Sequence, residues 1–451
     1  MKHCSGFQPS SRDEWLQPLA TWFAPAVAFL LLVPPEEVEE KQKTNNGAVW
    51  DQLIWIRGYV TILGDPASAL GGALMDVVND FEHVARFCYV DECLEKDTTA
   101  FVILAGHLKY RKNEPLGAAW CSGEGDEDSI RKRKHAIKMI LSAKTSFLSG
   151  VFLPCVLAIA VAAATLNDYY GKKGDSTTGL NLAYGVWYNW LLVLAVVCNC
   201  SINSISSDVA QLSFKEVLPD LVTSSVPLRK RYANTAEWNH WLNQKYPGGQ
   251  YTGVGASDTH NASSRMDFDG PFYLKFVVGQ TLGWCCVAFF TACATVIAYT
   301  TPTVGIGCRS MNFILYAATA LLICLLVVFR HWVENSGLAS GGDRTKRFKR
   351  ILDALYCTLV LFNFLVIFGG TGFHLAGRWH TCRCMSLFGR PGDLIELAPY
   401  TKQAKENAEN FWLLIAHVSY SISWLIIVVC VAVRSYVIMR LESYYYPRYT
   451  T

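Results

Sequence analysis

Four side chains that can bind a metal ion lie close together in the C-terminal part of the chain. The stretch FHLAGRWHTCRCMSLFG, residues 373–389, contains His374, His380, Cys382 and Cys384. Imidazole and thiolate groups both bind zinc or copper, so residue type and spacing would permit a metal site. Two cysteines in an oxidising compartment would more simply form disulfide bonds. The choice between these two chemistries therefore depends on the compartment that the stretch faces.

The composition indicates a membrane protein. Of the 451 residues, 51% are hydrophobic and only 17% are charged, whereas soluble proteins have about 25% charged residues. The apolar residues fall into blocks of about 18–24 residues, the length that a helix needs to cross a hydrocarbon core of about 30 Å. The net charge is +3 and no basic stripe interleaved with aromatic residues occurs. We therefore expect a lipid bilayer, and not a nucleic acid, as the partner.

We predict an all-α bundle of about seven membrane-spanning helices. Six blocks have no Asp, Glu, Lys or Arg in their interior, and in lipid such a block can satisfy its backbone only as a helix. A seventh block, Pro18–Val33, is shorter and contains Pro25. The alternative for it is a signal peptide, but Asp13 and Glu14 stand where a signal peptide has basic residues. The six clear blocks are Thr145–Leu166, Leu182–Ile202, Phe276–Tyr299, Asn312–Phe329, Ala354–Gly372 and Phe411–Val433.

Basic segments predict the orientation. Lys and Arg residues beside spans stay on the cytoplasmic face, and RKRKHAIK (131–138), RKR (229–231) and RTKRFKR (344–350) fall on one side of the predicted bundle. We expect a multi-pass protein of the plasma membrane or an endomembrane, with its C-terminus in the cytoplasm. The predicted regions are 1–34 with the weak first span, 35–144 as a cytoplasmic helical region, 145–203 with two spans, 204–272 as a cytoplasmic loop, 273–433 with four spans, and 434–451 as a cytoplasmic tail.

One apolar segment does not fit this scheme. Residues 58–78 are hydrophobic enough to span, but Asp65 and Asp76 would cost several kcal/mol at membrane depth. The sequence GDP instead predicts a helix start, with Asp65 as the N-cap and Pro66 at the first helical position. We expect an amphipathic helix on the cytoplasmic face. If the segment spans instead, the bundle has eight crossings.

Three of the 16 cysteines fall in predicted exterior loops: Cys308, Cys382 and Cys384. The exterior is oxidising, and the intervening helices bring these loops to the same face. A disulfide between Cys308 and either Cys382 or Cys384 is the simplest prediction, because a bridge between the latter two would close a strained ring. A metal site that uses His374, His380 and these cysteines is one alternative. Unpaired thiols are the other.

Few polar side chains fall inside the six predicted spans. Asn189, Gln280 and Asn363 could line a polar path, although such residues more often bond neighbouring helices. His417 is the one titratable side chain at depth. Ion-coupled pumps usually need membrane carboxylates or basic relays, and these spans offer neither.

Four short motifs carry a resemblance to other proteins. LGDP (63–66), LAYGVWYNW (182–190), YTTPTVGIGCRS (299–310) and the Cys-x-Cys of WHTCRC (379–384) resemble, in that order, motifs of fungal multi-pass integral membrane proteins of unassigned function. The likeness extends from about residue 58 to residue 433. It implies a membrane location and no particular activity.

The sequence favours a non-enzymatic function. It has no His-Glu-x-x-His, no Gly-x-Ser-x-Gly and no phosphate-binding loop, so we expect no cofactor. A receptor-like or scaffold protein with cytoplasmic protein partners is the first hypothesis. The alternatives are a channel or facilitator with Asn189, Gln280, Asn363 and His417 along a polar path, and an enzyme with an unrecognised membrane site.

Glycosylation tests the predicted orientation. Asn261 belongs to an NAS sequon in a loop that the basic segment 229–231 places in the cytoplasm. Sequons are modified only in the lumen, so Asn261 should carry no glycan, whereas a sequon introduced into the loop 373–410 should carry one. The measurement is gel mobility before and after endoglycosidase. A shift of the wild-type protein that Asn261→Gln abolishes would mean that the orientation is inverted.

Overall fold

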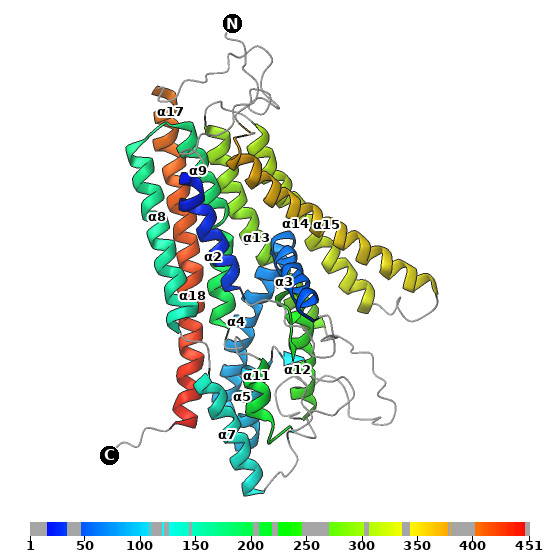
Figure 1. The fold of residues 1–451 in the computed structure, drawn as a ribbon. Coiled ribbons are helices and arrows are strands. Elements are labelled where there is room, and N and C mark those ends of the chain that lie inside the picture. Colours follow the sequence, from blue (N-terminus) through cyan, green and yellow to red (C-terminus); the bar gives the residue numbers. More distant parts are fainter. Residues whose placement is uncertain are drawn as a thin grey trace, which may run out of the picture.

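Long helices run side by side through the structure (Figure 1). The computed structural model describes residues 16–33, 47–106, 108–109, 120, 126–143, 147–201, 207–218, 224–245, 270–301, 306–335, 343–377, 379 and 402–446. Within these ranges, the strands are β1 (Leu108–Lys109) and β2 (Ser224–Ser225), which pair antiparallel. The predicted all-α fold is confirmed.

Among the described residues, six helical segments are long and apolar enough to cross a membrane, which confirms the six clear predicted blocks. The weaker N-terminal block forms a shorter apolar helix, Leu16–Leu32, made of η1 (Leu19–Phe23) and α2 (Ala24–Leu32). The six segments are built from η3 (Leu148–Phe152) with α8 (Leu153–Gly171), α9 (Ser176–Trp187) with α10 (Asn189–Cys200), α13 (Gly270–Thr300), α14 (Cys308–Asn335), α15 (Asp343–Leu375), and α17 (Lys402–Asn407) with η6 (Ala408–Trp412) and α18 (Leu413–Tyr445).

The segment formed by α9 and α10 is the centre of the bundle. Inside the structure, 94% of its apolar window is buried, against 28% for the segments that contain α8 and α18. A helix that is apolar all round and still uncovered by protein suits contact with lipid. We therefore describe the bundle as membrane-embedded, with an upper end at α17 and a lower end at α7 as drawn in Figure 1.

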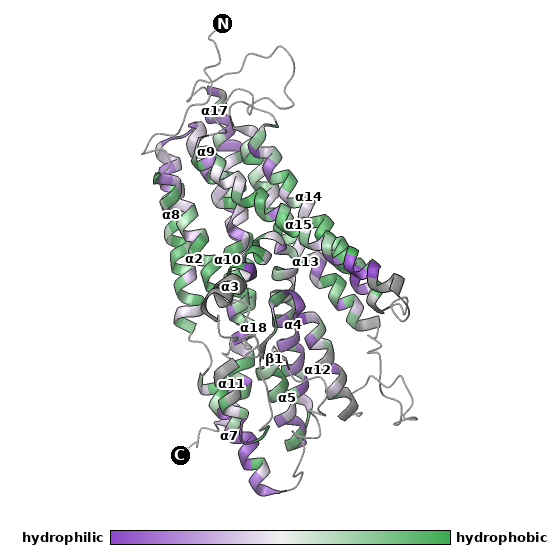
Figure 2. Ribbon diagram, turned by 45° about the vertical axis from the view of Figure 1, so that its right-hand side comes forward, coloured by the Kyte–Doolittle hydropathy of each residue, from purple (hydrophilic) through white to green (hydrophobic). Residues whose placement is uncertain are grey.

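A second hydrophobic core lies at the lower end. Phe101 and Trp120 stack there with ring centroids 4.1 Å apart, and Tyr445 Oη donates a hydrogen bond of 2.7 Å to Asp97 Oδ1. Hydrophilic residues are frequent along the helices of this lower lobe, as Figure 2 shows. The lobe is built from α5 (Cys93–Ala105), α7 (Glu127–Ala143), α11 (Ser207–Phe214), α12 (Arg231–Lys245) and the ends of α4 (Pro66–Tyr89) and α18.

The segment 58–78 lies inside the bundle, so the predicted position of this helix on the cytoplasmic face is wrong. The helix α3 (Gly47–Gly64) ends and α4 begins within this segment, at mid-height in Figure 1. The first turns of α4, Pro66 to Ala73, are buried, and α4 packs along α13. The predicted helix start is confirmed, because Asp65 Oδ1 accepts a hydrogen bond of 3.2 Å from the Ser68 amide. We call Gly64–Pro66 the α3–α4 turn.

Glycines let α4 approach α13 at backbone distance. A Cβ atom at Gly283 of α13 would overlap the carbonyl oxygen of Ala67, and one at Gly71 of α4 would overlap the carbonyl oxygen of Gly279. Small residues allow such close contact between membrane helices, where dispersion forces supply most of the attraction. The position of the α3–α4 turn therefore depends on these glycines.

We expect Gly283→Ala to lower the thermal unfolding temperature of the detergent-purified protein. The added methyl group must push α4 away from α13, and such overpacking costs about 1–3 kcal/mol. Gly369→Ala on α15 is the matched control, because a Cβ there meets nothing within 4 Å. Alanine is the better helix former by about 1 kcal/mol, so this control should keep or raise the unfolding temperature. Equal effects of the two substitutions would contradict the close α4–α13 contact.

Candidate functional site

A buried carboxyl group lies at the α3–α4 turn. Asp65 is 2% exposed, and its Oδ2 accepts a hydrogen bond of 2.8 Å from Tyr356 Oη of α15. Arg229 Nη1 donates to the same Tyr356 Oη at 3.3 Å. Arg229 belongs to η4 (Leu228–Lys230), whose chain leads into α12 of the lower lobe. A hydrogen-bonded series thus runs from Asp65 through Tyr356 to Arg229.

Side chains of α14 and α15 donate hydrogen bonds to the last carbonyl groups of α3. Tyr316 Oη donates to the Leu63 carbonyl oxygen, and Asn363 Nδ2 donates to the Gly64 carbonyl oxygen, each at 2.9 Å. The last carbonyl groups of a helix have no partner within it, so these two bonds are what allow α3 to end inside apolar surroundings. Asn363 lies near the middle of its span, Arg347–Leu375, so the turn is level with the middle of that span.

Gln280 of α13 binds the start of α4. Ser68 Oγ donates to Gln280 Oε1 at 3.1 Å, and Cys324 Sγ of α14 lies 3.7 Å from the Gln280 carbonyl oxygen. Gln280 is 0% exposed, as is Asn363. Two of the four polar residues predicted inside the spans therefore meet at the α3–α4 turn.

The other two predicted polar residues lie elsewhere. Asn189 Nδ2 donates to Ser419 Oγ at 3.1 Å and joins α10 to α18. His417 is exposed on the outer surface of α18, and its Nδ1 hydrogen-bonds the Leu413 carbonyl oxygen at 2.6 Å. The four residues therefore do not form one path.

Sequence reasoning missed Asp65, Tyr356 and Tyr316 as members of this site. The motif GDP identified Asp65 as a helix cap, but a cap is ordinarily a surface feature. The tyrosines stand in apolar blocks, where an aromatic residue is usually only packing. The apolar character of residues 58–78 was the one sequence feature that indicated a buried position, because a surface helix is rarely so hydrophobic.

An ion pair lies where α4 enters the lower lobe. Asp76 Oδ2 accepts from Arg231 Nη1, and both side chains are almost fully buried. Arg231 Nε also donates to the Val226 carbonyl oxygen at 3.4 Å. Asp76 stands eleven residues after Asp65, about 16 Å along the helix, which is about half the hydrocarbon thickness. The pair therefore ties α4 to α12 about three helical turns below the α3–α4 turn.

His83, further along α4, is buried in the lower lobe. Burial lowers its pKa to about 4, although the neighbouring Glu82 acts in the opposite direction. Lys275 and Arg86 add to the lowering. His83 is consequently neutral at pH 7 and contributes no charge below the α3–α4 turn.

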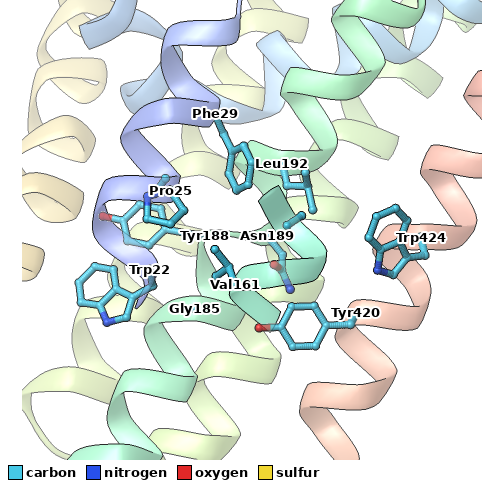
Figure 3. Close-up of a pocket in the computed structure, with 12 residues that line it drawn as sticks. Trp22, Pro25, Phe29, Val161, Gly185, Tyr188, Asn189, Leu192, Tyr420 and Trp424 are labelled. Atoms are coloured by element: carbon cyan, nitrogen blue, oxygen red, sulfur yellow. The ribbon is translucent and has the colours of Figure 1, made fainter. Parts of the chain in front are cut away.

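A small cavity opens between α2, α8, α10 and α18 (Figure 3). Tyr188, Asn189 and Tyr420 supply its polar groups, and the remaining wall is mostly apolar. Its volume is about 20 Å³, which is room for one ordered water molecule and not for a substrate. We therefore place the candidate site at the α3–α4 turn. The labelled lining residues in Figure 3 are Trp22, Pro25, Phe29, Val161, Gly185, Tyr188, Asn189, Leu192, Tyr420 and Trp424.

The predicted metal ligands are placed only in part. His374 is buried, stacks on Tyr184 with centroids 4.2 Å apart, and hydrogen-bonds Asn181 Oδ1 through Nε2 at 3.2 Å. His380, Cys382 and Cys384 lie outside the described residues. Among the residues that the structure does describe, no group of three or more His, Cys, Asp or Glu side chains could hold a metal.

Cys308 differs from the other described cysteines. Eleven of the described cysteines are free thiols, and Cys308 is not among them. Both predicted partners, Cys382 and Cys384, are outside the described residues. A bridge from Cys308 to either of them stays a prediction.

Comparisons with known proteins give no relative. No family model, no curated protein and no solved structure matches the chain. The resemblance to fungal multi-pass membrane proteins therefore stays a prediction, and function has to be argued from the site.

We expect Asp76→Asn to destabilise the protein by about 3–5 kcal/mol, because it leaves the buried Arg231 charge without a counter-ion. The double variant Asp76→Leu/Arg231→Met should recover most of this loss. Asp128→Asn, which removes an exposed ion-pair partner of Lys132, should have no measurable effect. Denaturant unfolding in micelles measures all three. A loss for Asp76→Asn no larger than for Asp128→Asn would contradict the buried pair.

Proposed function

We propose that the protein is a membrane transport protein in which protons pass Asp65 at the centre of the bundle. The observation that carries the proposal is the hydrogen-bonded series Asp65, Tyr356 and Arg229, which begins inside the bundle and leads toward its lower end. This proposal develops the channel hypothesis. The six predicted spans contain no carboxyl group, and Asp65 at the α3–α4 turn supplies one.

An acidic side chain inside a membrane is costly and rare, and in known proteins it usually marks an ion or proton pathway. The α3–α4 turn adds a second argument. Transporters commonly bind their ions at the membrane centre, at helices that are interrupted there. Asp65 is the cap of such an interrupted helix, and Gln280 and Ser68 provide further polar groups beside it.

Tyr356 is suited to relay a proton. Its hydroxyl group donates to Asp65 and accepts from Arg229, which keeps its own proton and orients the phenol. A proton that reaches the Tyr356 oxygen from solvent can therefore release the phenol proton to the Asp65 carboxylate. Toward the upper end, Tyr316 contacts the end of α3, and Tyr188 bonds Thr371 at 2.6 Å. These hydroxyl groups extend the polar series above the turn.

A receptor-like or scaffold function is the second candidate. The lower lobe supports it, because it has its own hydrophobic core, the Tyr445–Asp97 bond and many hydrophilic residues at the end that we predict to be cytoplasmic. Cytoplasmic protein partners would bind there.

Proton uptake into proteoliposomes tests the proposal. Vesicles loaded with K⁺ and an internal pH-sensitive dye are diluted into K⁺-free buffer, and valinomycin makes their interior negative. We expect the wild-type protein to acidify the interior faster than protein-free vesicles do. Asp65→Asn should reduce this excess rate at least tenfold, because asparagine caps a helix as well as aspartate but exchanges no proton.

Asp168→Asn is the control. Asp168 is a half-buried carboxylate of α8 that pairs with Lys172, away from the turn, and its substitution should keep the wild-type rate. A wild-type rate equal to that of protein-free vesicles, or an unchanged rate in Asp65→Asn, would overturn the proposal.

A further inference from the structure

A buried arginine near the upper end of the bundle has no counter-ion among the residues that the structure describes. Arg309, the second residue of α14, is 9% exposed, and its Nε and Nη2 atoms are buried without a hydrogen-bond partner. Its electrostatic neighbour is Tyr184 of α9. Within the described part of the chain, no acidic side chain pairs with Arg309.

Buried charges in proteins are paired, because an isolated one loses its hydration without compensation. We propose that Arg309 is the centre of a binding site for a small carboxylate anion. This inference goes beyond the proposed proton pathway and does not depend on it.

Two buried amide groups in this part of the bundle also lack acceptors. Asn312 follows it by one helical turn, so both side chains project from the same face of α14. Asn312 Nδ2 and Asn181 Nδ2 are both buried without a partner. Buried donors of Arg309 and Asn312 are therefore left without acceptors, as expected where an anion completes the hydrogen bonding.

Tyr184 brings these groups together. Its hydroxyl group donates to the Gly370 carbonyl oxygen at 3.2 Å, and a Cβ atom at Gly370 would overlap the Asn312 amide, so Asn312 lies beside the same point of α15. On its other side, the Tyr184 ring stacks on His374, which hydrogen-bonds Asn181. Arg309, Asn312 and Asn181 thus surround one tyrosine.

The geometry of the guanidinium group selects the anion. Nε and Nη2 donate in parallel from one edge, which matches the two oxygen atoms of a carboxylate. Arg309 supplies a single positive charge, so a monoanion is neutralised whereas a dianion such as sulfate keeps an excess charge. A spherical chloride ion must accept both hydrogen bonds at a single atom, which matches the two parallel donors less well than the two oxygen atoms of a carboxylate do.

Thermal unfolding of the purified protein in detergent, followed by tryptophan fluorescence, tests the site. The probe is sodium acetate, compared with sodium chloride and sodium sulfate at equal ionic strength and pH 7. We expect acetate to raise the unfolding temperature saturably and more than either other salt. Arg309→Gln should abolish the acetate effect, and Arg309→Lys, which keeps the charge but loses the paired donors, should weaken acetate binding about tenfold. Arg330→Gln on the same helix, whose side chain pairs with Asp353, should keep the acetate effect.

Without added anion, Arg309→Gln should unfold at the same temperature as wild type or higher, because it removes an uncompensated buried charge. Equal effects of acetate and chloride on the wild-type protein would overturn the proposal. So would an acetate effect that persists in Arg309→Gln, or a lower unfolding temperature of Arg309→Gln in the absence of anion.

Discussion

A backbone that turns inside a membrane must find all of its hydrogen bonds within the protein, because lipid offers none. The α3–α4 turn is the place where this constraint acts in the present bundle. Asp65 satisfies an amide of α4, and Tyr316 and Asn363 satisfy carbonyl groups of α3. The helices α14 and α15 must therefore hold these two side chains at the level of the turn.

Packing around the turn follows from the same constraint. The glycines of α4 and α13 bring the two backbones into contact, and this contact places Ser68 within reach of Gln280. Below the turn, the Asp76–Arg231 pair joins α4 to the lower lobe. The helix α4 thus begins at the Asp65 carboxyl group and ends in the lower lobe. A movement of α4 at Asp65 would therefore reach the lower end.

The sequence was sufficient for the features that depend on composition and local chemistry. Long uncharged blocks predicted the six spans, and Asp65 followed by Pro66 predicted the start of α4. The sequence was insufficient where side chains distant along the chain lower the free-energy cost of burying a charged or polar group. The expected penalty for Asp65 assumed lipid around it, whereas Tyr356 comes from the other end of the chain to bond it. The predicted place of His417 on a polar path was wrong for the opposite reason. A single polar residue in an apolar block does not show which face of α18 packs against the protein.

The most direct test of this account is photocrosslinking from α15 to the turn. Tyr356→p-benzoylphenylalanine places a reactive carbonyl group beside Asp65, since the native hydroxyl oxygen lies 2.8 Å from that carboxylate. After irradiation in native membranes and proteolysis, mass spectrometry should find a crosslink to the peptide that contains residues 63–68. Crosslinks to lipid or to other helices, with none to this peptide, would contradict the placement of the α3–α4 turn inside the bundle.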